Sequence, residues 1–437
     1  MKTDILIVGS GCSGLYCAWN LPRDKKITII TKSEVESGDS FIAQGGMCML
    51  KSENDYDSFF EDTLKAGHYE NDKKSVEIMI RSSQPVVNDL ISFGTDFQKE
   101  ADGTLAYTRE GAHSAKRIIF HKDVTGKEIT SRLLAQVKTL SNVTIYEYTR
   151  LLDIISKDNR CLGGVVLNKN GNQIKVKADI VVLATGGIGG LYRQSTNFRY
   201  LTGDALAIAI KHNVALKNIN YVQIHPTTFY SEREDERRFL ISESVRGEGA
   251  KLYNKDGKRF VNELLPRDLL TEAIYEQMKK DGTKFVWEDL RTIPKEELVS
   301  HFPNIIEYCR QMGYDVTKEC IPVVPAQHYF MGGIKVNYES KTTMEDLYAV
   351  GETACNGVHG RNRLASNSLL ESLVFAKRAA LDMITSKATI DIDKVTDDKF
   401  FEEFDLSAYE DEKALDTEYK RLINKKIEEA NEASRIA

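Results

Sequence analysis

The first thirty residues combine an apolar run, a glycine-rich turn and a helical stretch, in that order. Ile5–Val8 is unbroken and rich in β-branched residues, as in a strand buried on both faces of a parallel sheet. Gly9-Ser10-Gly11-Cys12-Ser13-Gly14 follows at once, and the helical stretch Leu15–Leu21 leads to a second strand at Ile27–Thr31. Glycines at this spacing permit a tight turn and a close approach of backbone to pyrophosphate, whose charge the helix N-terminus stabilises. The pattern predicts an α/β fold with a dinucleotide site; a purely structural glycine turn is the alternative.

The end of the second strand departs from the usual fingerprint of such sites. Thr31-Lys32 stands where an acid normally binds the ribose, and Glu34 has about the right spacing but lies too far into the loop. Lys32 is therefore expected to line the adenosine side of the cofactor, with a solvated lysine as the alternative.

Two later strands run into turns that fit the same cofactor. Ile180–Leu183 leads into Ala184-Thr185-Gly186-Gly187, which we expect to lie against the cofactor, and Leu347–Val350 leads into Gly351-Glu352. The carboxylates of Glu352 and Asp204 can accept hydrogen bonds from the polyol hydroxyls of FAD, although each is equally typical of a turn or cap residue.

A capped helix is predicted to open at Ser366–Glu371 and to continue through Leu381. Ser368 and Glu371 have the spacing of a capping box, and apolar residues then recur at helical spacing. The free N–H groups of Ser368 and Leu369 are expected to face the pyrimidine edge of a flavin, where the helix dipole stabilises the charge that appears on reduction.

Composition excludes several classes of protein. The 437 residues have room for two or three domains, and a formal charge of −6 gives no basic footprint for nucleic acid. No run approaches the ~18 apolar residues that a membrane span requires. The first strand begins almost at residue 1, so no signal peptide is expected. The seven cysteines are scattered without a CxxC pair, so neither disulfides nor a metal site is predicted, and a reducing cytoplasm is the expected compartment.

Five further motifs occur in order along the chain: Asp39–Gly46, Gln223–Thr227, Arg246–Gly249, Pro266–Asp268 and His359–Ser368. With the glycine turn, they resemble the flavoprotein family of succinate dehydrogenase and fumarate reductase, over roughly residues 3–385. The resemblance implies a Rossmann-like (GR2-type) FAD-binding domain over residues 1–219 and 328–386, interrupted by an α+β capping domain over residues 220–327. Residues 387–437 are expected to form a linker followed by a short C-terminal helical tail, with its charged helix at Leu415–Ala433. Such a tail is shorter than the C-terminal helical domain usual in relatives.

The resemblance also implies which residues contact FAD. Asp39 stands where respiratory relatives present the histidine that bonds covalently to the flavin, so non-covalent FAD is expected. The cofactor-binding residues expected from the motifs are Gly9, Ser10, Gly11, Cys12, Ser13, Gly14, Lys32, Asp39, Ser40, Phe41, Ala43, Gln44, Gly45, Gly46, Ala184, Thr185, Gly186, Gly187, Asp204, Glu352, Ser368 and Leu369.

For the substrate, the resemblance implies a four-carbon dicarboxylate, which needs cationic and hydrogen-bonding groups at both ends. It assigns substrate contact to Gln223, His225, Ser242, His328 and Arg363. Arg363 can hold a carboxylate with two parallel bonds. Without the resemblance, either histidine would be an ordinary core residue.

The same resemblance assigns proton transfer to Arg267, with Glu243 and Arg246 as a relay. An arginine is a poor base because it is essentially always protonated, so the proton acceptor stays open between this route and direct loss from a substrate amino group. A plain salt bridge on one helix is the alternative interpretation of Glu243 and Arg246.

Glu110, in Thr108–Ser114, is the residue that bears on the substrate. Relatives that oxidise succinate look apolar there, whereas a carboxylate offers a partner to a substrate ammonium group. The sequence therefore favours oxidation of L-aspartate to iminoaspartate, which supplies quinolinate and NAD synthesis, with oxygen or fumarate as electron acceptor. Whether the unstable imine passes directly to a quinolinate synthase is left open by the sequence. The alternatives are a fumarate reductase or succinate dehydrogenase type of flavoprotein, a flavin-binding protein without catalysis and, for Glu110 alone, an exposed surface carboxylate.

Overall fold

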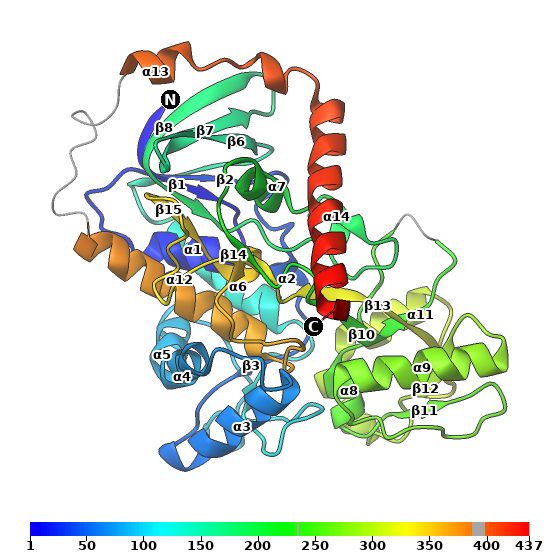
Figure 1. Cartoon of the computed structure of the whole chain (residues 1–437). Coiled ribbons are helices and arrows are strands. Elements are labelled where there is room, and N and C mark those ends of the chain that lie inside the picture. The colour runs from blue at the N-terminus through cyan, green and yellow to red at the C-terminus, as the bar shows by residue number, and fades with distance from the viewer. Residues whose placement is uncertain (234–235, 387–397, 437) are drawn as a thin grey trace.

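The computed structural model describes residues 1–233, 236–386 and 398–436, and Figure 1 shows two lobes of unequal size. The larger lobe is built on a seven-stranded sheet of order β5-β2-β1-β8-β7-β6, with β15 paired to β8. These strands are β1 (Lys2–Val8), β2 (Ile27–Ile30), β5 (Val143–Tyr146), β6 (Arg150–Lys157), β7 (Arg160–Leu167), β8 (Gln173–Leu183) and β15 (Leu347–Ala349).

The predicted N-terminal βαβ unit is confirmed. β1 lies between β2 and β8, parallel to both, and α1 (Cys12–Asn20) joins β1 to β2. Ile5 and Ile7 belong to the core on the side of α1 and α12 (Asn367–Ser386), whereas Leu6 and Val8 belong to the core on the opposite side. An unbroken apolar run is required because both faces of β1 are covered.

The later strands also lie where the sequence predicts. β8 and β15 are parallel to one another and end beside the glycine turn of β1, so three strand ends meet at one edge of the sheet. In parallel sheets this is the edge at which ligands bind. β6, β7 and β8 form an antiparallel extension of the sheet.

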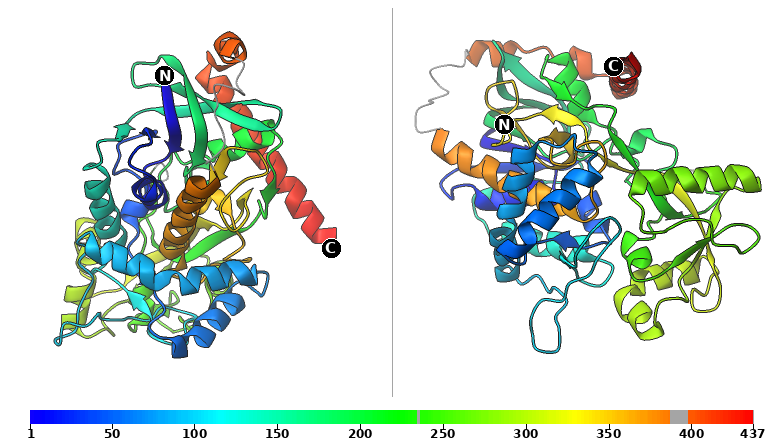
Figure 2. Two further views of the ribbon diagram at one scale, coloured as in Figure 1. Left: turned by 90° about the vertical axis from the view of Figure 1, so that its left-hand side faces the viewer. Right: turned by 60° about the horizontal axis from the view of Figure 1, so that its bottom comes forward.

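Helices cover both faces of this sheet (Figures 1 and 2). On one face, α1 packs against both α12 and α6 (Thr125–Val137). On the other face, α7 (Asp204–Lys211) packs against α14 (Glu412–Ile436), the C-terminal helix drawn in red. The other elements of this lobe are α2 (Asp39–Ile42), β3 (Met47–Cys48), η1 (Glu53–Asp55), α3 (Tyr56–Ala66), α4 (Lys73–Arg81), α5 (Ser83–Ser92), β4 (Ile118–Ile119), η2 (Gly189–Leu191), β9 (Leu216–Lys217), β14 (Gly333–Lys335), η3 (Gly351–Thr353), β16 (Ala354–Cys355), α13 (Asp398–Glu403) and η5 (Ser407–Tyr409).

The smaller lobe has its own sheet, of order β10-β13-β12-β11, and its own hydrophobic core. Its elements are β10 (Val222–Phe229), α8 (Glu243–Gly247), β11 (Lys251–Tyr253), α9 (Arg267–Asp281), β12 (Val286–Asp289), α10 (Lys295–His301), α11 (Pro303–Gln311) and β13 (Ile321–Phe330). This lobe falls in the region predicted as the capping domain. The predicted boundary at residue 328 lies inside β13, which passes from the smaller lobe back to the larger one.

The C-terminal tail contains the predicted charged helix, which spans Glu412–Ile436 rather than Leu415–Ala433. Tyr419 and Ile423 on this helix are buried against the larger lobe, and the Tyr419 hydroxyl donates a hydrogen bond to the Leu152 carbonyl. The predicted linker, residues 387–397, lies outside the described residues. Within the described part of the chain, no helix has the length and apolar character needed to cross a membrane.

Candidate active site

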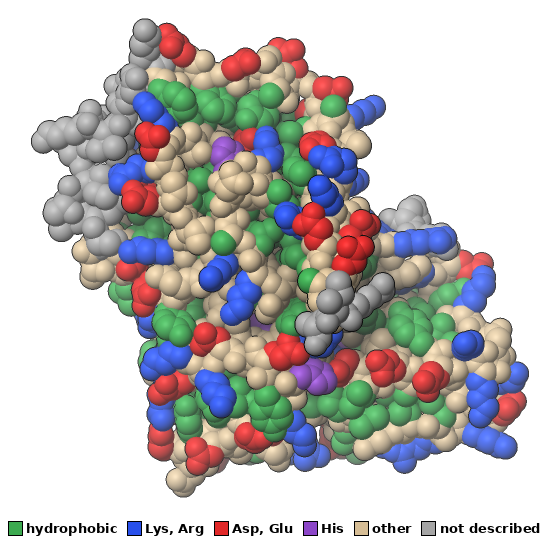
Figure 3. Space-filling model, viewed as in Figure 1, with side chains coloured by type: hydrophobic (Ala, Val, Ile, Leu, Met, Phe, Trp, Pro, Cys, Tyr) green, Lys and Arg blue, Asp and Glu red, His purple; other side chains and the backbone are tan. Residues whose placement is uncertain are grey.

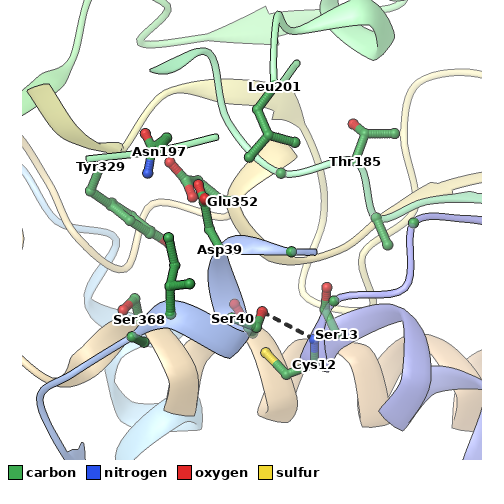
Figure 4. Close-up of a pocket in the computed structure, with 18 of the residues that line it drawn as sticks. Cys12, Ser13, Asp39, Ser40, Thr185, Asn197, Leu201, Tyr329, Glu352 and Ser368 are labelled. Atoms are coloured by element: carbon green, nitrogen blue, oxygen red, sulfur yellow. Dashed lines mark hydrogen bonds between the residues drawn. The ribbon is translucent and has the colours of Figure 1, made fainter. Parts of the chain in front are cut away.

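One large pocket lies where the strand ends of the larger lobe meet the smaller lobe. Figure 4 shows part of it, with side chains from α1, α2, β13 and the start of α12 directed into the same space. The predicted residues that line it are Gly9, Ser10, Gly11, Cys12, Ser13, Lys32, Asp39, Ser40, Ala43, Gln44, Gly45, Gly46, Glu110, Ala184, Thr185, Gly186, Asp204, His225, Ser242, Glu243, Arg267, His328, Glu352, Arg363, Ser368 and Leu369. Gly14, Phe41, Gly187, Gln223 and Arg246 do not line it.

The glycine turn after β1 fits a dinucleotide. Gly9 has φ +118°, and a Cβ there would lie 2.0 Å from the Ala184 carbonyl oxygen. A Cβ on Gly14 would lie 2.1 Å from the Gly9 oxygen, so Gly14 allows helix and strand to pack closely. Gly11, at the N-cap of α1, offers no side-chain cap, and the first N–H groups of a helix lack intrahelical partners. Of these, the Cys12 N–H donates to Ser40 Oγ at 3.1 Å (Figure 4). The turn is thus shaped for a phosphate at a helix N-terminus.

Two carboxyl groups fit a ligand rich in hydroxyls. Glu352 Oε1 accepts a hydrogen bond from the Phe330 N–H at 2.8 Å, and Asp39 Oδ1 accepts one from the Phe198 N–H at 3.1 Å. Asp39 Oδ2 is buried without any partner, and Figure 4 shows both side chains in the same part of the pocket. Burial raises the pKa of Glu352 to about 8 and that of Asp39 to about 7. A buried carboxyl oxygen without a hydrogen-bond partner suits a hydroxyl donor of a polyol chain.

The Asp204 carboxylate is already bonded to other side chains of the protein. This favours the alternative interpretation of Asp204 as a turn or cap residue over its prediction as an acceptor for FAD hydroxyls. Its Oδ2 lies 2.8 Å from Lys32 Nζ and 2.9 Å from Arg150 Nε, while Thr202 donates to Oδ1. Lys32 also donates to the Tyr200 carbonyl, so it lies at the pocket wall and is not a solvated lysine.

The helix predicted at Ser368 exists, but the capping box is wrong. α12 begins at Asn367, after Ser366, which has φ +62°. The Ser368 hydroxyl accepts a hydrogen bond from Arg363, and Glu371 accepts one from Asn356, so neither side chain caps the helix. Ser368 and Leu369 nevertheless lie in the first turn of α12 and line the pocket.

Two buried arginines face the pocket from opposite lobes. Gln223 Oε1 accepts from Arg267 Nη1 at 2.7 Å and from Arg363 Nε at 3.3 Å, and so holds the two guanidinium groups in place from behind. Burial and the charge of Arg267 lower the pKa of Arg363 to about 10. Among the residues that the structure describes, no carboxylate lies within ion-pair distance of Arg363. This cation is therefore available to an anionic ligand.

The two predicted histidines lie next to each other in the pocket, with ring centroids 5.1 Å apart. The Thr227 N–H donates to His225 Nδ1 at 3.2 Å, while His225 Nε2 is buried without a partner. His328 Nδ1 lies 2.7 Å from Thr196 Oγ1. Burial lowers the pKa of both imidazoles well below its usual value, so both rings are neutral at neutral pH.

Arg267, Glu243 and Arg246 form a charged chain at the pocket wall. Arg267 Nε donates to Glu243 Oε2 at 2.5 Å, and Arg246 Nη2 lies 3.8 Å from the same oxygen. The Ser242 hydroxyl accepts from the Ser244 N–H and caps α8, which carries Glu243 and Arg246. Burial raises the pKa of Glu243, but the two arginines outweigh burial and leave the pKa below its ordinary value.

Glu110 is buried, with 3% of its surface exposed, so the alternative of an exposed carboxylate is wrong. Ser244 Oγ donates to Oε1 at 2.6 Å and Ser366 Oγ donates to Oε2 at 2.5 Å. Burial, followed by repulsion from Glu243, raises the pKa of Glu110. No cation of the described residues lies within ion-pair distance of this carboxylate. A cationic ligand group would supply the missing charge.

Several residues at the site were not predicted from the sequence. Thr196, Tyr329 and Ser366 line the pocket and contact predicted residues. No local pattern marks Thr196 or Tyr329, whereas Ser366 lies within the motif His359–Ser368 without having been assigned a contact. Arg117 is fully buried behind the Glu110 loop, bonded to Asp55 and Asp62. Arg117 follows His113 by four residues in the sequence, and His113 Nδ1 lies 3.1 Å from Arg117 Nη1 in the structure. This spacing is the sequence feature that could have pointed to Arg117.

Comparison with known proteins agrees with this geometry. The family model described as "FAD binding domain" matches residues 4–369, which makes this a flavoprotein. L-aspartate oxidase of Clostridium perfringens is 48% identical over 424 residues, covering 97% of this chain and 93% of the relative. L-aspartate oxidase 2-b of tobacco is 38% identical, covering 86% of this chain and 61% of the relative. An Escherichia coli quinol fumarate reductase has a similar solved structure, with a TM-score of 0.84 and 29% identity over 91% of this chain and 73% of that one. The chain belongs to the FAD-binding flavoproteins and, within them, to the L-aspartate oxidase family.

Proposed function

We propose that this chain oxidises L-aspartate to iminoaspartate with non-covalently bound FAD, the first step of NAD synthesis through quinolinate. The observation that carries the proposal is the juxtaposition of buried Glu110 with the buried cations Arg267 and Arg363 in one pocket. A ligand that satisfies this arrangement has two carboxylates and an ammonium group. When bound, FAD supplies the acceptor for the hydride that leaves the α-carbon.

The residues of the pocket can bind the two ends of aspartate differently. Arg363, free of any described carboxylate partner, is suited to hold one carboxylate through two parallel hydrogen bonds. His225 Nε2 lacks a partner and can donate to the other carboxylate. The ammonium group then pairs with Glu110, and that pairing offsets the cost of burying an unpaired carboxylate.

The proton balance involves Arg267 and Glu110. Oxidation to the imine removes a hydride from carbon and a proton from nitrogen, and Glu110 is placed to receive the latter. In the separate reduction of fumarate to succinate, one alkene carbon gains a hydride and its neighbour gains a proton. Arg267 is our candidate donor of that proton, because its Nε is bonded to Glu243 and can be reprotonated from that side.

Fumarate reduction without aspartate oxidation is the second candidate. The similarity in fold to the quinol fumarate reductase favours it, and the same two arginines would bind fumarate. Glu110 argues against it, because fumarate and succinate leave that carboxylate without a partner. We therefore assign fumarate the role of an electron acceptor, alongside oxygen, for flavin that aspartate has reduced.

Two further parts of the proposal concern the setting of the enzyme. Iminoaspartate hydrolyses readily in water, which favours a hand-off to a quinolinate synthase. We also propose a cytoplasmic enzyme. Figure 3 shows acidic and basic side chains interspersed over the face in view, with no continuous basic stripe for nucleic acid.

The test is an anaerobic incubation of the purified holoenzyme with L-aspartate and fumarate. Succinate should form in equal amount to oxaloacetate plus unhydrolysed imine, because the two hydrogens lost by aspartate are gained by fumarate. Formation of succinate only with an artificial reductant, and never with aspartate, would favour the fumarate reductase.

A further inference from the structure

The C-terminal helix α14 lies against the outside of the cofactor pocket, and the proposed reaction gives it no role. None of the residues Glu412–Ile436 lines the pocket. The helix nevertheless packs along α7 (Figure 1), whose first residues, Asp204 and Ala205, do line it. A helix in this position can act on a bound ligand only through the wall residues that it contacts.

Arg150 makes the polar contact between α14 and the pocket wall. It begins β6, lines the pocket, and its side chain is 12% exposed. Its Nη2 donates to Asp416 Oδ1 on α14 at 2.5 Å, and its Nε donates to Asp204 Oδ2 at 2.9 Å. Because the donors of a guanidinium group have a fixed planar geometry, the two carboxylates together fix the orientation of Arg150. One side chain thus joins β6, α7 and α14.

Ile423 makes the apolar contact between α14 and the same wall. Its side chain is fully buried in the core on the α7 side of the sheet. Gly203, the N-cap residue of α7, has φ +74°, and a Cβ there would lie 3.1 Å from Ile423 Cδ1. Nearby, the Tyr419 hydroxyl donates to the carbonyl of Leu152 on β6. The helix therefore lies directly against the turn that presents Asp204 to the pocket.

This wall belongs to the end of the pocket where the adenosine half of FAD is expected. Lys32 follows β2, the second strand of the βαβ unit, and the residue at that place lies beside the ribose in dinucleotide folds. Lys32 Nζ lies 2.8 Å from Asp204 Oδ2, the oxygen that Arg150 also contacts. Burial raises the pKa of Asp204, but Lys32 and Arg150 outweigh burial and leave the pKa below its ordinary value. Asp204 is therefore a carboxylate at neutral pH that holds two cations in the wall.

We propose that α14 sets the affinity for FAD, by holding Arg150 and the start of α7 where they form the adenosine end of the pocket. Asp416 and Ile423 are positioning residues, because they touch residues of the wall and not the pocket itself. With no covalent link expected, affinity alone retains the cofactor. The inference goes beyond the proposed function, since it requires only that FAD binds in this pocket, whichever substrate is oxidised.

The charge of Asp416 and its contact with Arg150 predict opposite effects on FAD. The pyrophosphate of FAD is anionic, so removing a negative charge nearby would by itself strengthen binding. Losing the contact instead leaves Arg150 with Asp204 as its remaining carboxylate partner among the described residues. Arg150 is then less well fixed, which weakens binding. A rise in the Kd for FAD therefore reports the contact and not the charge.

The polar contact is tested with Asp416→Asn, which removes the charge and keeps the shape. Glu418→Gln is the matched control on the same helix. Both acids have side chains 46% exposed and pair with an arginine, but the partner of Glu418 is Arg421, which is exposed on α14 itself. The Kd is measured by titrating apoprotein with FAD and following flavin fluorescence. Thermal unfolding of the apoprotein and of the holoenzyme is measured on the same preparations.

The apolar contact is tested in the same way with Ile423→Val, which removes only the Cδ1 methyl that faces Gly203. Ile427→Val removes the same methyl one turn later on α14, where the residue is partly buried, and is the matched control.

Asp416→Asn should raise the Kd for FAD about fivefold, at the low end of couplings between sites, because the ion pair is half-exposed. Ile423→Val should raise it less, since a single methyl is lost. Both controls should keep the wild-type Kd, and in both test variants the holoenzyme should lose more thermal stability than the apoprotein.

A Kd that is unchanged or lower in Asp416→Asn overturns the inference, and so does an equal rise in Glu418→Gln. Equal losses of stability in apoprotein and holoenzyme also overturn it, because α14 would then only support the fold. If aspartate does not reduce the wild-type flavin, the proposed function fails while this inference stands.

Discussion

Replacing Glu110 by glutamine should remove the preference for aspartate over succinate. The substitution keeps the size of the side chain and one oxygen that accepts a hydrogen bond from one of the two hydroxyls, of Ser244 or Ser366. The other hydroxyl has to turn and accept from the new amide group, and the charge is removed. In the wild-type pocket that charge has no cationic partner within ion-pair distance among the described residues, so a substrate ammonium group is what balances it.

The magnitude follows from the burial of Glu110, which is 3% exposed. Removing one member of a buried ion pair commonly costs ~3–5 kcal/mol. At about 1.4 kcal/mol per factor of ten, this corresponds to roughly two to four powers of ten in kcat/KM for aspartate. Succinate and fumarate present no ammonium group, so Glu110→Gln should leave their binding unchanged or improve it.

The assay is anaerobic stopped-flow reduction of the bound flavin by aspartate, with fumarate reduction and succinate binding measured on the same samples. A pH series adds a second readout. Because the pKa of Glu110 is raised, the acid becomes neutral at a higher pH than an ordinary glutamate. KM for wild-type aspartate should therefore rise as the pH falls through that range, and Glu110→Gln should lose this dependence. If Glu110→Gln lost the same fraction of kcat/KM with aspartate and with fumarate, Glu110 would not select the substrate. If it lost activity with neither, the assignment of aspartate would lose its main support.

Three other predictions can be checked with purified protein. Because Asp39 stands where covalent flavoproteins have histidine, acid precipitation should release all flavin into the supernatant; yellow pellet would contradict this. Arg267→Lys should lower fumarate reduction by ~100- to ~10,000-fold with little change in the affinity of a dicarboxylate inhibitor, and near-normal turnover would exclude Arg267 from proton transfer. Arg117 is fully buried between Asp55 and Asp62, so Arg117→Met should lower the free energy of unfolding in urea by ~3–5 kcal/mol. The control Arg132→Met breaks a half-exposed pair with Glu128 and should cost less than ~1 kcal/mol; equal effects would refute the assigned role of burial.

Much of the larger lobe could be predicted because its signals are local. The β1 run is apolar on both faces, and glycine is required at residue 9, where φ is positive and the Ala184 carbonyl lies too close for a side chain. The start of α12 could not be located in the same way. Ser368 and Glu371 have the spacing of a capping box, but Arg363 and Asn356 bond to them instead. Those contacts depend on the tertiary fold and leave no trace in the local pattern.

The sequence could indicate which residues line the site better than it could indicate what each of them contacts. The motifs named Glu110, His225 and Arg363, whereas the sequence alone could not show that Glu110 is buried. Asp204 illustrates the opposite case. It has the position expected of a hydroxyl acceptor, yet Lys32 and Arg150 occupy its carboxylate.

The most direct test of the account is the absorbance of the bound flavin under anaerobic conditions, on adding L-aspartate and, separately, succinate. The account predicts that aspartate bleaches the oxidised flavin rapidly and completely, and that succinate at the same concentration bleaches it far more slowly. Rapid bleaching by succinate with none by aspartate would contradict the central claim that Glu110 makes this pocket a site for an amino dicarboxylate.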